Sequence, residues 1–131
     1  MTETVAAILA AHRAGTLSPA QTVARSYQRI RDHDDPAIFI SLRDEKQALA
    51  EAEALAARKD ATQLPLFGIP VAVKDNIDVA GMATTSACPA FAYTPARDAT
   101  SVARLRAAGA VVIGKTNLDQ FATGLVGVRS P

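Results

Sequence analysis

The chain has 131 residues, of which 49% are hydrophobic and 21% charged, an ordinary composition for one globular domain that buries a core. Its formal net charge is only +1, and its aromatic residues are four Phe and two Tyr with no Trp, so neither nucleic acid nor an anionic membrane is an expected partner. The single cysteine, Cys88, excludes an internal disulfide and favours a reducing, cytoplasmic compartment.

The first 15 residues, MTETVAAILAAHRAG, are predicted to form a helix. Its apolar face contains Val5, Ile8 and Leu9, and Gly15 is expected to end it. An acidic residue precedes the short apolar run and no basic segment is present, so this is not the pattern of a signal peptide. No stretch of the sequence approaches the apolar length of a membrane span, and no membrane partner is expected.

A second helix is predicted from Pro19 to about Asp32. Ser18 can cap its first turn, and Gln21 is placed to complete a capping box with Ser18. Apolar residues follow at helical spacing from Val23 onward, which gives the helix a face for the core.

A short strand at residues 38–42 and a long helix at residues 44–59 are expected next. Acidic residues lie early in this helix, whereas Arg58 and Lys59 lie late, which suits the helix dipole. Its alanine-rich face indicates close packing against another element or against a partner. Residues 1–60 are therefore predicted to be mainly helical.

The second half, residues 64–131, is predicted to begin an α/β core. Residues 69–74 alternate as a short, largely buried strand, and residues 75–97 are expected to be irregular. A connection of that length in a compact domain is usually functional or an insertion.

The next helix is expected to start at Asp98 or Thr100 and to close at Gly109. The apolar run at residues 110–113 then predicts a strand buried on both faces. A strand, a crossover helix and an apolar strand in this order are typical of a parallel sheet.

Lys74 is the most informative residue of the sequence. It ends the predicted apolar strand at residues 69–74, within the segment LPLFGIPVAVKDNIDVAG at residues 64–81. Lysine is rarely buried without a partner, and burial favours the neutral amine, which can act as a general base. Asp75 has the opposite effect, since a neighbouring carboxylate keeps a lysine charged. From the spacing alone, a strand-end lysine that reaches water and pairs with Asp75 is the favoured interpretation.

Two segments, residues 66–88 and 98–124, resemble the amidase signature family of serine hydrolases. The order of the two segments and their separation along the chain also resemble that family. The resemblance implies a mixed sheet covered by helices, and catalysis by a lysine, a cis-serine and a nucleophilic serine. The lysine of that family's G-x-P-x-x-V-K-D segment corresponds to Lys74, which favours a general base over a surface ion pair. The resemblance implies no cofactor and no metal.

The glycine- and serine-rich segment that carries both catalytic serines in that family is absent from the sequence. Ser86, in the loop after Lys74, is more typical of a residue that satisfies loop backbone groups than of a nucleophile. We therefore expect residues 1–131 to be the N-terminal portion of one amidase domain, incomplete at the C-terminus and inactive alone. A homodimer remains open for the full-length protein.

Residues 117–131, NLDQFATGLVGVRSP, look most like the allophanate hydrolase branch, because other branches tend to carry Glu-Phe where this chain has Asp119-Gln120-Phe121. The expected substrate is then a small amide, allophanate, cleaved to ammonia and carbon dioxide during urea degradation. The alternatives are the A subunit of a tRNA-dependent amidotransferase and a non-catalytic remnant that docks on a full-length homologue.

The remaining polar residues suggest structural roles. Residues 109–116, GAVVIGKT, match the spacing of a nucleotide-binding loop, but their apolar, β-branched centre predicts a strand. His12 and His33 lack metal-site spacing, and Cys88 is expected to be a buried structural thiol.

A last helix is predicted within residues 118–124, capped by Asn117 and Gln120. Asp119 is expected to cap or pair, and Arg129 to be a solvated loop residue.

Overall fold

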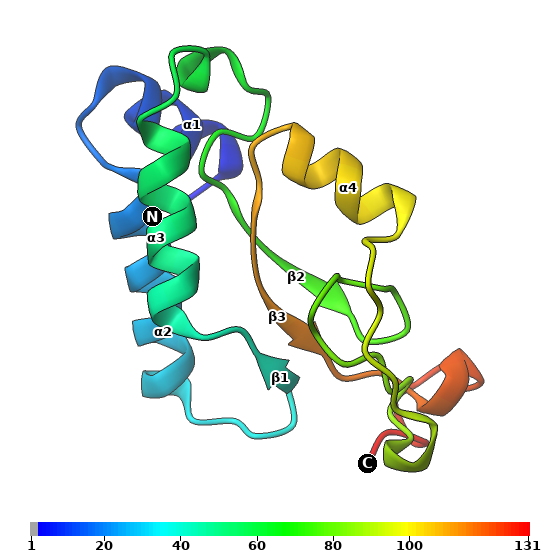
Figure 1. Ribbon diagram of the computed structural model, residues 1–131. Coiled ribbons are helices and arrows are strands. Elements are labelled where there is room, and N and C mark those ends of the chain that lie inside the picture. The colour runs from blue at the N-terminus through cyan, green and yellow to red at the C-terminus, as the bar shows by residue number, and fades with distance from the viewer. Residues whose placement is uncertain (1–2) are drawn as a thin grey trace.

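The computed structural model describes residues 3–131 (Figure 1). The helices are α1 Val5–Ala14, α2 Pro19–His33, α3 Glu45–Ala56 and α4 Thr100–Ala107, and the strands are β1 Phe39–Leu42, β2 Pro70–Lys74 and β3 Val111–Thr116. Three short 3-10 turns, η1 Ala61–Gln63, η2 Pro89–Phe91 and η3 Gln120–Ala122, lie in the connections. No helix among the described residues is long and apolar enough to cross a membrane.

The predicted start of α2 is confirmed in detail. The side chain of Ser18 accepts a hydrogen bond from the backbone N–H of Gln21 (3.1 Å), and the side-chain oxygen of Gln21 accepts one from the N–H of Ser18 (2.8 Å). These two bonds satisfy donors that a helix N-terminus otherwise leaves free. The preceding helix ends at Gly15 as expected, in the left-handed conformation with φ of +70°.

The three strands form a mixed sheet in the order β1-β3-β2, which confirms the expected fold class. The central strand, β3, runs parallel to β2 and antiparallel to β1. The register between β2 and β3 shifts by one residue between Val71 and Ala72, so that Ala72 lies opposite Gly114 and Val73 opposite Lys115. Because side chains alternate between faces, this bulge decides which residues of β3 share a face with those of β2.

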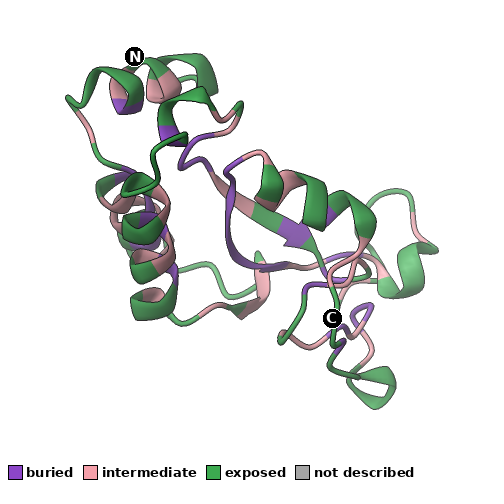
Figure 2. Cartoon of the chain, turned by 45° about the horizontal axis from the view of Figure 1, so that its top comes forward, coloured by how far each residue is buried: buried purple, intermediate pink, exposed green. Residues whose placement is uncertain are grey.

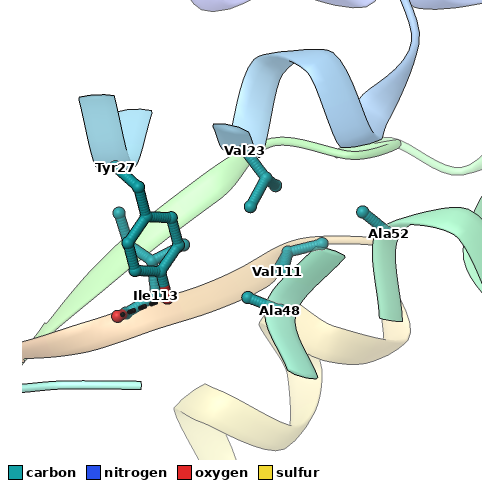
Figure 3. Packing of buried hydrophobic residues seen from close by; sticks show 6 residues of the cluster. All are labelled: Val23, Tyr27, Ala48, Ala52, Val111 and Ile113. Atoms are coloured by element: carbon teal, nitrogen blue, oxygen red, sulfur yellow. Dashed lines mark hydrogen bonds between the residues drawn. The ribbon is translucent and has the colours of Figure 1, made fainter. Parts of the chain in front are cut away.

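Helices α2 and α3 pack together on one face of β3, and α4 covers the other face (Figure 1). Figure 3 shows the first layer, in which two residues from each of α2, α3 and β3 point toward one another: Val23, Tyr27, Ala48, Ala52, Val111 and Ile113. Ala48 and Ala52 are fully buried, so the alanine face of α3 serves close packing within the chain. Burying each large apolar side chain of this layer contributes roughly 1.5–3 kcal/mol.

The start of α4 confirms one of the two positions that the sequence predicted. The helix begins at Thr100 after Ala99, and no side chain caps it. The Asp98 carboxylate instead accepts a hydrogen bond from the backbone N–H of Ala80 (2.7 Å) and pairs with Nε of Arg106 (3.2 Å). Asp98 therefore ties the long loop to α4 from outside the helix.

The prediction of a last helix within residues 118–124 is wrong. Only the three-residue turn η3 forms, and Phe121 within it has a φ of +53°, which an α-helix cannot contain. Asp119 explains the difference, because its carboxylate accepts backbone N–H bonds from Gly127 (3.0 Å) and Arg129 (2.7 Å) and folds the segment back on itself. Asn117 does not cap a helix either, since its amide donates to the carbonyl of Ala37 (3.0 Å).

Candidate functional site

Lys74 is the last residue of β2 and lies opposite Thr116 of β3. It is exposed, as is Ala72 on the same face of the strand, whereas Val73 between them is buried. The prediction of a largely buried strand at residues 69–74 that ends in a desolvated Lys74 is therefore wrong, because only Ile69 and Val73 are buried. The reason is that β2 is an edge strand of the sheet, and Ala72 and Lys74 remain exposed on its open face. Figure 2 shows the chain coloured by burial.

Asp75 lies at the start of the loop after β2 and is fully buried. One carboxylate oxygen, Oδ2, accepts hydrogen bonds from the backbone N–H (3.0 Å) and the hydroxyl of Thr85. The other, Oδ1, lies 3.1 Å from Nζ of Lys115, whose side chain is also fully buried. The Asp75 backbone is held as well, because its N–H donates to the carbonyl of Thr116 (3.1 Å) and its carbonyl accepts from the N–H of Ser86 (3.3 Å).

Lys115 is the buried lysine of the chain, and the other three are exposed. Besides its ion pair with Asp75, its ammonium group donates to the carbonyl of Ala83 (3.1 Å) and to the hydroxyl of Thr84 (3.4 Å). A buried ammonium needs such partners, since desolvation alone would cost several kcal/mol.

The contacts continue from Thr84 to Asp78. The Thr84 hydroxyl donates to Oδ1 of Asp78 (2.8 Å), and the same oxygen accepts a bond from the Tyr93 hydroxyl (2.7 Å). The bonds from Tyr93 and Thr84 lower the pKa of Asp78, and the bond to Asp78 raises the pKa of Tyr93. The long loop is thus fastened to the end of the sheet by two carboxylates, one ammonium group and three hydroxyls.

This geometry excludes one of the two interpretations of Lys74 that the sequence left open, the ion pair with Asp75. Asp75 does not pair with Lys74, because its side chain lies on the opposite, covered side of the strand and pairs with Lys115. Lys74 makes no ion pair with any residue from 3 to 131. The site therefore presents the Lys74 side chain on an open face, without an ion-pair partner among residues 3–131, and the paired Asp75 carboxylate on the covered side of the strand.

Ser86 lies in the loop that covers Asp75. It is buried with a φ of +52°, and Ala87 after it has a φ of +60°, an unusual conformation for two consecutive residues with side chains. The Ser86 carbonyl accepts a bond from the N–H of Phe121 (3.0 Å), and its N–H donates to Asp75, so its backbone connects β2 to the C-terminal turn. The hydroxyl that satisfies loop backbone belongs to Thr85, which accepts from the N–H of Ala87 (3.2 Å).

The other candidate residues have structural partners. His12 is buried between the carbonyl of Phe67 (2.8 Å) and the hydroxyl of Thr22 (2.6 Å), and among residues 3–131 no group of three His, Cys, Asp or Glu side chains could hold a metal ion. The segment GAVVIGKT forms β3, as its apolar centre predicted. Cys88, expected to be buried, is only half-buried.

Sequence reasoning missed the role of Lys115. The signal was a lysine that follows a fully apolar run, but the same pattern at Lys74 gives an exposed side chain. Only the strand register separates the two cases.

Comparison with known proteins places this geometry in a family. The Amidase family model matches residues 21–131. The chain belongs to the Amidase family. The solved structure of Kluyveromyces lactis allophanate hydrolase superposes with a TM-score of 0.82 at 43% identity, covering 100% of this chain and 22% of that one.

Two groups of relatives are similar to the chain in sequence. Urea amidolyase from Lachancea kluyveri is 59% identical over 98 residues, which is 75% of this chain and 5% of that protein. A glutamyl-tRNA(Gln) amidotransferase subunit from Oleidesulfovibrio alaskensis is 40% identical over 126 residues, which is 95% of this chain and 25% of that protein. The chain thus spans a quarter or less of each of these three relatives.

Proposed function

We propose that this chain is the lysine-bearing part of an Amidase-family hydrolase that cleaves allophanate to ammonia and carbon dioxide. The observation that carries the proposal is the 59% identity with a urea amidolyase, against 40% with the amidotransferase subunit. The structural likeness to an allophanate hydrolase over the whole chain supports the same assignment. The substrate class is a small-molecule amide.

We propose that Lys74 is the general base, and its exposure on the open face leaves its side chain accessible to a second serine. A serine hydroxyl is a weak nucleophile until a base removes its proton. In the mechanism that the family resemblance implies, the neutral Lys74 amine accepts that proton through a second serine, and the serine oxygen attacks the amide carbon. The proton then passes to the leaving nitrogen as the C–N bond breaks, and water hydrolyses the acyl-enzyme.

The two serines are proposed to come from polypeptide outside this chain. None of its six serines lies in a glycine- and serine-rich segment, and Ser86 has its backbone committed to Asp75 and Phe121. The open face of β2 at Ala72 and Lys74 is where such a segment would reach the amine. Accordingly, the isolated chain should release no ammonia from allophanate.

A chimaera tests the proposal directly. Residues 1–131 replace the corresponding segment of Kluyveromyces lactis allophanate hydrolase, and ammonia release from allophanate is measured. We expect an active chimaera in which Lys74→Met lowers kcat by at least about 100-fold, the usual minimum contribution of a general base. Lys59→Met, an exposed lysine beyond α3, is the matched control and should leave kcat unchanged. Full activity of the Lys74→Met chimaera would refute the role of Lys74.

The amidotransferase alternative rests on the 95% coverage of this chain by the match to that protein. It predicts that the same segment, placed in the amidotransferase, supports amide transfer, whereas the allophanate hydrolase chimaera stays inactive. An active chimaera on allophanate together with an inactive amidotransferase hybrid would decide for the hydrolase. A non-catalytic remnant predicts that both hybrids are inactive and that the chain co-purifies with a complete homologue.

A further inference from the structure

The buried ion pair directly behind Lys74 has no part in the steps described above. We propose that Lys115 is a positioning residue for Lys74: by neutralising Asp75, it prevents that carboxylate from holding Lys74 in its cationic form. This inference rests on the proposed function, in which Lys74 must be neutral to accept a proton.

The strand geometry explains why Asp75 needs such a partner. Asp75 is adjacent to Lys74 in the chain, and although its side chain lies on the opposite side of β2, an uncompensated carboxylate there would favour the charged form of the Lys74 amine. Asp75 itself is fully buried, so little water surrounds its carboxylate to screen the negative charge. With Lys115 Nζ 3.1 Å from Oδ1 and two bonds from Thr85 on Oδ2, the negative charge of Asp75 is already engaged on the covered side of the sheet.

The other charged groups around this pair leave Lys115 as the only cation that faces Asp75 from the described elements. On the loop, the Tyr93 hydroxyl donates a hydrogen bond to Asp78. Asp78 is linked to Lys115 through the Thr84 hydroxyl, which donates to Asp78 and accepts from Lys115. On α4, Arg106 is engaged by Asp98 and Glu51. No other described cation pairs with Asp75, so removing Lys115 would leave its carboxylate uncompensated.

The bulge between β2 and β3 makes this arrangement possible. It sets Lys115 opposite Val73, on the face shared with Asp75. If the register of the first two pairs continued without the bulge, Lys115 would lie opposite Lys74 on the open face, and the two ammonium groups would be neighbours. One register shift therefore separates the structural lysine from the proposed base.

The test is the pH dependence of kcat/KM for allophanate in the chimaera described above. Lys115→Met should move the alkaline rise of activity to higher pH by about 1 unit, the smaller end of the effect of one nearby charge. Asp75→Asn should move it to lower pH, since Lys115 is then uncompensated, and the double variant Lys115→Met with Asp75→Asn should return it to the parent position. Lys59→Met is the control and should not move it.

A purely structural role would lower stability without moving the pH profile. Unchanged profiles in Lys115→Met and Asp75→Asn would therefore overturn this inference while leaving the proposed function intact. Activity that survives Lys74→Met would instead refute the proposed function. If Lys115→Met fails to fold, the profile of Asp75→Asn alone decides, because an unshifted midpoint there contradicts the same charge argument.

Discussion

Replacing Gly68, two residues before β2, by alanine should strongly destabilise the fold. Gly68 has a φ of +72°, and a Cβ there would lie 2.5 Å from Cβ and 2.6 Å from Cγ of Pro19 and 3.0 Å from Nδ1 of His12. Neither neighbour can move easily. The Pro19 ring begins α2, and His12 is held by Phe67 and Thr22.

The expected cost has two parts. The left-handed conformation costs an alanine roughly 1–2 kcal/mol. Forcing a methyl group into a filled contact costs about 1–3 kcal/mol more. Gly68→Ala should therefore lower the free energy of unfolding by roughly 2–5 kcal/mol, a large share of the ~5–15 kcal/mol typical of a domain.

Gly15→Ala is the matched control, because Gly15 has nearly the same φ of +70° but nothing within 4 Å of an added Cβ. It should lose only the conformational part, roughly 1–2 kcal/mol. Urea unfolding of the chain, followed by circular dichroism, measures the free energy of unfolding of both variants. The comparison requires that the two variants have the same m-value. Equal losses in the two variants would show that the contact of Gly68 with Pro19 and His12 is not tight, and would refute the reasoning.

Two further predictions use the same unfolding assay. Burial raises the pKa of Tyr27 to about 12, above the value near 10 of an unfolded tyrosine, so stability should hold below about pH 10 and decline as the pH rises toward 12. Tyr27→Phe should lose about 1 kcal/mol at neutral pH through its bonds to Arg43 and Ile113, and it should lack that part of the alkaline decline; an unchanged slope would contradict the sign. Ser18→Ala should lose roughly 0.5–2 kcal/mol with the capping box, whereas Gln21→Ala, which keeps the Ser18 cap, should lose less. A greater loss in Gln21→Ala would refute that ranking.

Much of the fold could be predicted because its signals are local. The Ser18–Gln21 capping box depends on residues three apart, and the alternation in residues 69–74 depends on neighbours. The apolar centre of GAVVIGKT predicted a strand in place of a phosphate loop for the same reason. The last helix was missed because Asp119 binds the N–H groups of residues 8 and 10 positions further on, which the helical pattern of residues 118–124 does not report.

The sequence by itself determined where helices α1–α4 and strands β1–β3 form, though not the turn at residues 118–124, and it identified Lys74 through the pattern around it. Only the tertiary structure decided which lysine is buried. Lys74 and Lys115 both follow apolar runs, yet the first is exposed on an edge strand and the second is enclosed with Asp75, 40 positions away in the chain. The physical reason is register: a one-residue bulge beside Val71 assigns the two lysines to opposite faces of the sheet, and strand pairing at that distance is set by packing and not by the neighbouring residues.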